Sequence, residues 1–212
     1  MKIIKPSTEL MFITPNAAQL IEAAGRTCYK SEDKITDASA EKFVAMVSER
    51  GHHSVIEHAY ATFRIVTDRG ITHEIVRHRL ASYSQESSRY CNYSKDKFGS
   101  ELTLVPPSFK TKQGSLLWQV AARQSEVNYN AMIAAGEPPE IARGVLLTNQ
   151  KTEIVVTCNF REWLHFLKLR TAKAAHPDMR IVAKQIGCTL AIECPPVFSA
   201  YSCGDPECTT SI

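Results

Sequence analysis

The order of strand-like and helix-like segments is the feature that most limits the fold of this chain. Apolar and polar residues alternate over residues 60–66, and residues 151–158 are rich in β-branched side chains, so both segments are predicted strands. Helical segments and an extended polar run separate them, whereas a doubly wound parallel sheet places a helix after each strand. We therefore expect a mixed α/β (α+β) fold with a mainly antiparallel sheet flanked by helices, and not a Rossmann fold.

The glycines support the same exclusion. The chain has 212 residues and 9 glycines, and it contains neither G-x-G-x-x-G nor G-x-x-x-x-G-K-[ST]. A dinucleotide-binding turn and a P-loop both need such a motif, so any bound nucleotide must be held in another way. The length suits one domain or two small ones, and because no linker divides the chain, we expect a single domain over residues 1–212.

Charge and cysteine content bear on partners and location. The net charge of +3 is too small to indicate nucleic-acid binding. Seven scattered cysteines and no secretory leader predict reduced thiols in a cytoplasmic protein. No stretch reaches the ~18 consecutive apolar residues that a membrane span requires, so we expect no membrane partner.

Helix signals are distributed along the whole chain. The pattern predicts helices over residues 15–30, 39–50, 72–80, 113–135, 159–170 and 177–192, a further helix that begins at Pro138-Pro139, and a short strand over 101–105. We expect the first helix to stop at Gly25 or shortly after, and Ser39, Thr72 and Asn159 to cap the helices that they begin.

Histidine and arginine concentrate in one quarter of the chain. Five of the 7 histidines lie between His52 and His78, and five arginines lie between residues 64 and 89. A metal site is not expected, because His73 and His78 are five positions apart and would point about 140° away from each other on a helix. For His53 and His73 a hydrogen-bonded position at the edge of the core is the simpler interpretation.

The run over residues 77–90 combines three arginines, one histidine and four serines. Guanidinium groups bind phosphate through two hydrogen bonds, and hydroxyls add single donors. If residues 83–89 are extended, Tyr83, Gln85, Ser87 and Arg89 point to one side, which suits a phosphate and a nucleobase edge. A solvated basic loop is an equally good interpretation of this composition, and RNA binding is a weaker one.

Two further arginines are candidates for a site. Asn159 and Arg170 are eleven positions apart and share one helix face with Trp163 and Phe166. Arg170 either offsets the helix dipole or lines a pocket with an aromatic wall. Arg143 lies among apolar residues, where a guanidinium needs a partner in the protein or in a ligand.

Four short motifs follow one another along residues 15–195. Arg77-His78-Arg79 is followed after seven residues by Ser87, and residues 51–58 are Gly-His-His-Ser-Val-Ile-Glu-His. Residues 159–170 end in Phe-Leu-Lys-Leu-Arg, and residues 175–180 are Ala-His-Pro-Asp-Met-Arg. In this order they resemble the motifs of the flavin-dependent (alternative) thymidylate synthases. The chain departs from the family pattern at His176 and Asp178, where the family commonly has Gln and Glu.

The resemblance implies an activity, cofactors and an assembly. It implies reductive methylation of dUMP to dTMP, with methylenetetrahydrofolate as carbon donor and FAD reduced by NADPH as hydride donor. It also implies a homotetramer whose sites are built from several subunits, and chemistry without a cysteine nucleophile. Three alternative functions remain open: hydroxymethylation of dUMP on the same scaffold, a nucleotide-binding module without activity, and a metal-dependent hydrolase.

The resemblance also assigns residues, and it assigns no metal ligand. Arg170 would be catalytic, placed at the uracil. The cofactor-binding residues would be Ser54, Arg77, His78, Arg79, Gln85, Asn159, Arg161 and His165. The substrate-binding residues would be Glu74, Arg77, Gln85, Glu86, Ser87, Ser88, Arg89, Arg143 and Arg170. It gives no role to His53 or to the tail that holds Cys203 and Cys208.

Overall fold

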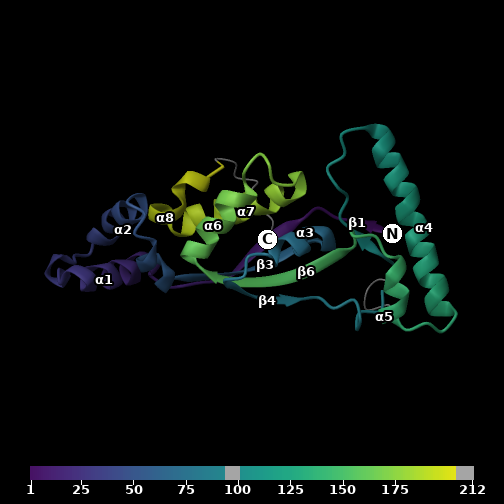
Figure 1. The fold of residues 1–212 in the computed structure, drawn as a ribbon, viewed down its shortest axis with the longest axis horizontal. Helices are drawn as coiled ribbons and strands as arrows, with labels where there is room; N and C mark the ends of the chain where they lie inside the picture. The colour runs from purple at the N-terminus through teal and green to yellow at the C-terminus, as the bar shows by residue number, and fades with distance from the viewer. Residues whose placement is uncertain (94–100, 204–212) are drawn as a thin grey trace. The chain divides into compact units, whose positions relative to one another are not determined.

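The computed structural model describes residues 1–93 and 101–203. Figure 1 shows helices and strands mixed along the chain. The strands are β1 (Lys2–Ile3), β2 (Ser7–Ile13), β3 (Tyr60–Asp68), β4 (Ala81–Gln85), β5 (Thr103–Leu104) and β6 (Lys151–Asn159). The α-helices are α1 (Ala17–Tyr29), α2 (Ser39–Glu49), α3 (Arg69–Ile75), α4 (Lys112–Ala134), α5 (Pro139–Ala142), α6 (Phe160–Arg170), α7 (Pro177–Glu193) and α8 (Pro195–Phe198).

Four strands form one sheet in the order β2-β3-β6-β4, and β1 pairs with β5 in parallel. The neighbours β3 and β6 run in opposite directions, because the Thr62 and Thr157 hydroxyls meet at 2.9 Å and Phe160 N–H donates to the Ala59 carbonyl at 2.9 Å. Alternate residues of β3 are buried, as the sequence pattern predicts. The expected mixed α/β fold with an antiparallel sheet is confirmed.

The chain divides into two compact units, which are described separately. Unit 1 holds Met1–Pro6, Val66–Ile75 and Ser84–Ile154. Unit 2 holds Ser7–Ile65, Val76–Tyr83 and the described residues from Val155 onward. Because β3, β4 and β6 each change unit part of the way along, both units contain pieces of the same strands.

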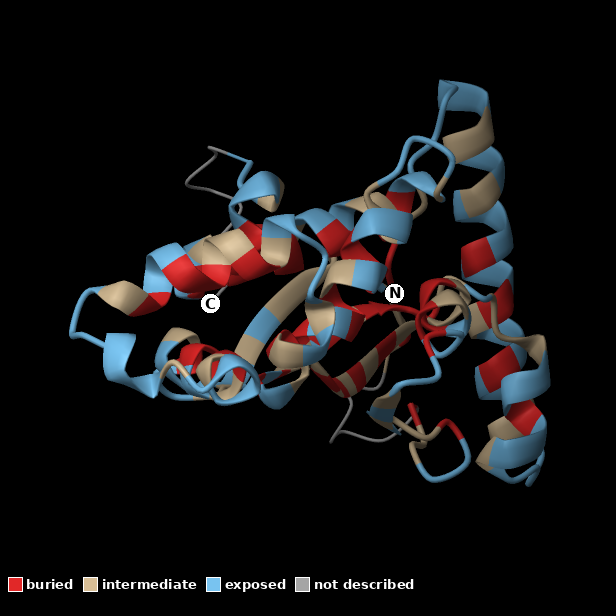
Figure 2. Cartoon of the chain, turned by 60° about the vertical axis from the view of Figure 1, so that its left-hand side comes forward, coloured by how far each residue is buried: buried red, intermediate tan, exposed pale blue. Residues whose placement is uncertain are grey.

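Unit 2 is built around the aromatic face of α6. The Trp163 ring packs edge-to-face on Phe63, with centroids 5.2 Å apart, and its indole N–H donates to the Ala61 carbonyl at 3.1 Å. Phe160 packs on Phe198 in the same way at 5.1 Å. Figure 2 shows helices with buried residues along one side and exposed residues along the other. One face of α6 is therefore anchored on the sheet, and its other face is available for polar side chains.

Helix α1 ends at Tyr29, close to the predicted bound at residue 30, but Gly25 lies inside the helix and does not stop it. A Cβ atom at Gly25 would lie 2.6 Å from the Phe43 ring. Glycine at this position therefore allows α1 and α2 to approach closely, and it does not end the helix.

Two of the expected helix caps are also wrong. Ser39 is the first residue of α2, and its hydroxyl donates to the buried Glu22 carboxylate at 2.8 Å, so it is used in a contact with α1. Thr72 lies inside α3, where the Asp68 carboxylate caps the first turn by accepting from Ile71 N–H at 2.9 Å. In both cases the hydroxyl bonds elsewhere, and a carboxylate or no side chain takes the cap position.

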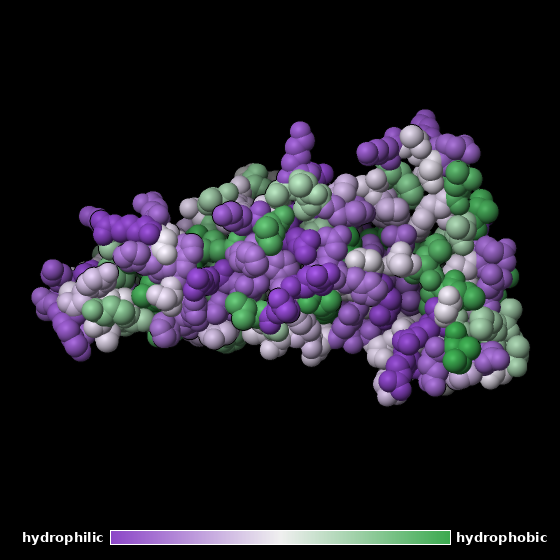
Figure 3. Space-filling model, in the orientation of Figure 1, coloured by the Kyte–Doolittle hydropathy of each residue, from purple (hydrophilic) through white to green (hydrophobic). Residues whose placement is uncertain are grey.

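Unit 1 is dominated by the long helix α4, which agrees with the predicted helix over 113–135. The Thr111 hydroxyl accepts from Gly114 N–H at 3.0 Å at its beginning, and Gly136 follows its end with a φ of 95°. Tyr93, Leu102, Tyr129 and Ala142 form a buried cluster beside it. Figure 3 shows apolar side chains at the surface over α4. Four of these are more than half exposed: Leu116, Leu117, Val120 and Val127.

The prediction that all cysteines are reduced is wrong for one pair. Cys188 in α7 and Cys203 form a disulfide, with Cα atoms 5.9 Å apart. The fold returns the chain after α8 to the side of α7, a proximity that cysteine spacing alone does not reveal. Cys208 lies outside the described residues. Within residues 1–93 and 101–203, no helix combines the length and apolarity needed to cross a membrane.

Candidate active site

The junction between β6 and α6 sets the position of the site in unit 2. Asn159 is the last residue of β6, and its side-chain oxygen accepts from Glu162 N–H at 2.9 Å. This is the cap that the sequence predicts. The cap fixes the first turn of α6, so that Glu162 and His165, three positions apart, lie on one side of the helix.

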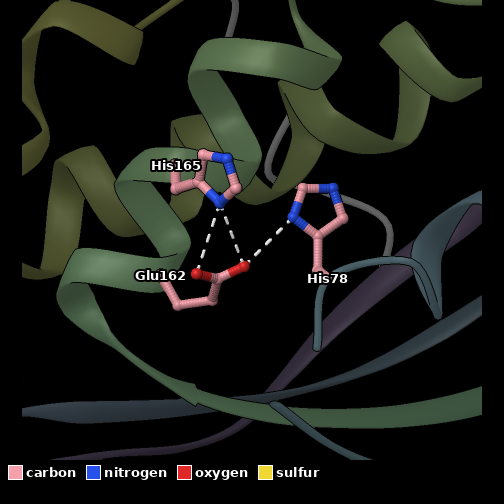
Figure 4. A group of neighbouring side chains, drawn as sticks. All are labelled: His78, Glu162 and His165. Carbon is pink, nitrogen blue, oxygen red and sulfur yellow. Dashed lines mark hydrogen bonds and ion pairs between the residues drawn. The ribbon is translucent and has the colours of Figure 1, made fainter. Parts of the chain in front are cut away.

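A cluster of three side chains lies beside this turn, as Figure 4 shows. His78 Nδ1 lies 3.1 Å from Glu162 Oε1, and His165 Nδ1 lies 3.2 and 3.3 Å from the two carboxylate oxygens. His78 is 5% exposed and Glu162 is 6% exposed. A buried carboxylate is costly without partners, and here two imidazole rings supply them.

Arg170 binds the second ring nitrogen of His78. Its Nε–H donates to His78 Nε2 at 3.0 Å. Because Nε2 accepts this bond, the hydrogen-bond network assigns the imidazole proton to Nδ1, which donates to Glu162. Burial lowers the pKa of His78 below its ordinary value and outweighs the opposing hydrogen bond to Glu162. The ring is therefore neutral near pH 7 and lies between a carboxylate and a guanidinium.

A cavity of about 1160 Å³ opens over this cluster in unit 2. Six of the predicted cofactor-binding residues line it: Arg77, His78, Arg79, Asn159, Arg161 and His165. Arg170 is not among the lining residues and reaches the cavity through His78. The three lining arginines are exposed and place positive charge around the cavity, which is suited to phosphate groups.

The first five residues of the Gly51–His58 motif, residues 51–55, line a second cavity of about 360 Å³ in unit 2. Ser54 lines only this smaller cavity, whereas His53 and Arg161 line both. The Arg161 guanidinium forms an ion pair with Glu57. The expectation of a core-edge position suits the half-buried His53 but is wrong for His73, which is exposed on α3.

Several predicted substrate-binding residues lie in unit 1. Arg143 Nη1 donates to the buried Ser88 hydroxyl at 3.1 Å, so the guanidinium has the partner that its apolar surroundings require. Gln85 Nε2 donates to the Thr72 and Thr152 hydroxyls at 2.9 and 3.2 Å. These bonds fix the side chains that the sequence singled out.

The two predicted substrate-binding acids, Glu74 and Glu86, and Arg89 have different surroundings. Glu86 accepts from Lys151 Nζ at 3.0 Å and from the Tyr93 hydroxyl at 3.0 Å, and Glu74 on α3 is half-buried. The Glu86 carboxylate is thus held by partners within the protein, whereas Arg89 is exposed.

The condition that residues 83–89 are extended is met only as far as Gln85, where β4 ends. The Ser87 carbonyl accepts from Tyr90 N–H at 3.2 Å and from Cys91 N–H at 3.0 Å, which closes a turn. Ser87 and Arg89 therefore do not continue the line of Tyr83 and Gln85 along one strand face.

Sequence reasoning missed Glu162. Its position three residues after a helix cap and three before a histidine is ordinary for an exposed acid. The signal that could have found it is its place on the same helix side as Asn159 and next to buried Trp163. The cluster of His78, Glu162 and His165 also has its nearest ligand atoms within 4.8 Å of one another, a spacing compatible with a metal ion, although no metal was predicted there.

The thiols near the site are poor nucleophiles. Burial raises the pKa of Cys158, which precedes Asn159, well above its ordinary value, and Cys158 is thus a neutral thiol at pH 7. Burial likewise raises the pKa of Cys194 to about 11.

The phenol of Tyr83 is also neutral at pH 7. Its hydroxyl donates to the His78 carbonyl, and burial raises its pKa to about 12.

Comparison with known proteins adds to this geometry. Residues 9–196 match the model of a family described as thymidylate synthase complementing protein. The chain is 35% identical over 181 residues to a flavin-dependent thymidylate synthase of Geobacter sulfurreducens, covering 82% of this chain and 77% of that protein. It is 34% identical over 199 residues to one of Mycolicibacterium vanbaalenii, covering 87% and 79%.

Two solved structures share the fold. One is a UMP/dUMP methylase, PolB, from Streptomyces cacaoi bound with 5-Br dUMP, with a TM-score of 0.80 at 22% identity, covering 95% of this chain and 97% of that one. The other is thymidylate synthase X from Helicobacter pylori with FAD and dUMP, with a TM-score of 0.76 at 22% identity, covering 93% and 99%.

Proposed function

Because the chain belongs to the flavin-dependent thymidylate synthase family, we propose that it converts dUMP to dTMP by reductive methylation. Methylenetetrahydrofolate would supply the carbon, and FAD reduced by NADPH would supply the hydride. The observation that carries the proposal is the arginine-lined cavity above the His78, Glu162 and His165 cluster, because it coincides with the family's motifs.

The residues around the cavity fit a flavin dinucleotide. The cavity of about 1160 Å³ is somewhat larger than the usual ligand pocket of about 300–1,000 Å³, which leaves room for a large cofactor. Arg77, Arg79 and Arg161 would hold the diphosphate through charged hydrogen bonds, and Asn159 at the end of β6 and His165 in α6 would contact the cofactor. When bound, FAD would supply the hydride, and the chain's part is to bind and orient its ligands.

The unit 1 residues would hold the nucleotide. Arg143, fixed on Ser88, and exposed Arg89 offer charge to the 5′-phosphate, and Gln85 offers a fixed amide. Glu74, Glu86 and Ser87 complete the proposed set. Arg143 is the strongest candidate in this set, because its guanidinium is already oriented before a ligand arrives.

Arg170 would act on the uracil. A fixed guanidinium stabilises negative charge that develops on the base and so activates C5 as the carbon nucleophile. Its bond to neutral His78 is the feature that supports this role, since it restrains the guanidinium without neutralising it. The reaction would need no cysteine, which agrees with the neutral buried thiol of Cys158.

We also propose that the two units work as one catalytic domain and that the enzyme is a cytoplasmic homotetramer with sites completed by neighbouring subunits. The exposed apolar side chains of α4, such as Leu117 and Val120, support burial of that helix in an assembly. Size-exclusion chromatography with light scattering tests the subunit number.

The deciding experiment is the visible absorbance of the purified protein before and after NADPH is added with dUMP present. A bound flavin that is bleached on reduction is expected, followed by dTMP on chromatography once the folate donor is added. Hydroxymethyl-dUMP as product would select the alternative reaction. A colourless protein that binds dUMP would indicate a binding module, and chelator-sensitive activity without a flavin spectrum would indicate a hydrolase. UMP is assayed in parallel as a second candidate substrate, because one of the solved structures with the same fold is a UMP/dUMP methylase.

A further inference from the structure

We propose that Glu162 is a positioning residue, which holds the Nδ1–H tautomer of His78 so that His78 Nε2 can accept from Arg170 and fix its guanidinium. The effect on turnover rests on the proposed function, whereas the tautomer does not. The resemblance described above assigns no role to Glu162. The inference comes from the chain of contacts Glu162–His78–Arg170.

The two bonds to His78 depend on each other. Arg170 Nε is always a donor, so the bond at 3.0 Å requires His78 Nε2 to carry no proton. A neutral imidazole has one proton, which must then be on Nδ1, where Glu162 Oε1 lies at 3.1 Å and only accepts. The carboxylate therefore selects the tautomer that makes the second bond possible.

Burial makes this selection effective. With His78 5% exposed and Glu162 6% exposed, water has little access to replace either partner. Phe166 packs edge-on against the His78 ring at 4.9 Å, and Tyr83 bonds to its backbone carbonyl. The ring is thus restrained from turning to exchange its nitrogens.

The charged groups that face His78 favour this arrangement over a metal ion. Glu162 and His165 lie on one side, but the guanidinium of Arg170 lies directly on the other. A divalent cation bound at Nδ1 would be repelled by this guanidinium and would displace the proton on which the arrangement depends. Binding of a metal is therefore an outcome that the test must distinguish.

The first test reads the tautomer directly in the flavin-loaded enzyme by ¹⁵N and ¹³C NMR of labelled histidine rings. The His78→Gln variant identifies the His78 signals. We expect a neutral ring with its proton on Nδ1, unchanged by a chelator. A proton on Nε2, a doubly protonated ring near pH 7, or a metal-bound Nδ1 would each overturn the proposal. This measurement needs neither turnover nor a Glu162 variant.

The second arm uses Glu162→Gln, which removes the charge and leaves one acceptor in place of two. One imidazole then faces the amide N–H₂ group, so the His78 proton should no longer be held on Nδ1 alone. Glu162→Ala removes both acceptors, and an unchanged His78 spectrum in that variant would refute the assignment to Glu162. The matched control is Glu193→Gln, an exposed acid in the last turn of α7.

The kinetic arm separates positioning from general support of the fold. Loosening a reacting group by about 1 Å costs up to about a hundred-fold in rate, so Glu162→Gln should lower kcat by about ten- to a hundred-fold with FAD retained. In an Arg170→Ala background the same change should cost almost nothing more, because Glu162 acts through Arg170. Full additivity would overturn the proposal. If the wild type makes no dTMP, the proposed function fails, and the NMR result still decides the tautomer.

Discussion

Arg170 and His78 are 92 positions apart in the chain, yet Arg170 Nε lies 3.0 Å from His78 Nε2. The arginine is the last residue of α6, and the histidine follows α3. An arginine at a helix C-terminus commonly offsets the helix dipole. Here it also binds a buried neutral ring that lines the cavity, although Arg170 itself is not one of the lining residues.

Replacing Arg170 by alanine should separate cofactor binding from chemistry. We expect the flavin spectrum to remain and kcat for dTMP formation to fall by roughly a hundred- to a thousand-fold, the scale of one lost contact to a developing anion. Arg170→Lys keeps the charge but loses the Nε–H donor and should be nearly as impaired. Retained turnover in the alanine variant would remove Arg170 from the catalytic role.

Replacing Arg143 by alanine should weaken nucleotide binding. Loss of a charged hydrogen bond costs about 1.5–3 kcal/mol, so we expect the dissociation constant for dUMP to rise by about ten- to a hundred-fold. Ser88→Ala, which removes only the 3.1 Å support of the guanidinium, should have a smaller effect. Isothermal titration with dUMP measures both variants, and equal affinity in Arg143→Ala and the wild type would contradict the assignment.

His78 should contribute to the pH dependence of stability. Its folded pKa is lowered, so the unfolded state binds more protons between the folded and unfolded values. The stabilising contribution is complete above the ordinary pKa and is lost as the pH falls toward the folded value. Urea unfolding at about pH 7.5 and about pH 5.5 should therefore show a larger loss of stability in the wild type than in His78→Gln. Equal losses would exclude His78 as the cause.

The cap at Asn159 should contribute measurably to the stability of the protein. Asn159→Ala is expected to lower the free energy of unfolding by about 1 kcal/mol, because Glu162 N–H loses its acceptor. Asn159→Asp keeps the acceptor and should lose much less. Urea denaturation at matched flavin occupancy measures the difference, and an alanine variant as stable as the aspartate variant would contradict the cap.

Gly25 should not tolerate a methyl group. A Cβ atom would lie 2.6 Å from the Phe43 ring, so Gly25→Ala should cost about 1–3 kcal/mol through overpacking. Gly144 has no atom within 4 Å of its built Cβ, and Gly144→Ala should be close to neutral. Thermal unfolding compares the two. A neutral Gly25→Ala variant would show that α1 and α2 can separate without cost.

Local patterns predict the elements of this fold well where one face is buried. The alternation of β3 and the Asn159 cap of α6 were both readable, because each depends on neighbours in sequence. The failures at Gly25 and Ser39 share one cause. Each residue makes its decisive contact with a different helix, so the competing tertiary contact does not appear in its own segment.

The candidate site divides in the same way. The residues with distinctive chemistry, such as His78 and Arg143, could be singled out from the sequence. Glu162 could not, since its importance comes from burial against a histidine 84 positions earlier. The disulfide between Cys188 and Cys203 was likewise hidden, because it depends on the path of the chain after α8.

The junction at Asn159 leaves no room for a change in chain length. The residue ends a strand and caps a helix, so one inserted residue would turn α6 by about 100° relative to β6 and move Glu162 and His165 away from His78. A deletion would do the same in the opposite sense. Insertions and deletions among related chains are therefore expected to avoid this point, which makes it a reliable anchor for aligning them.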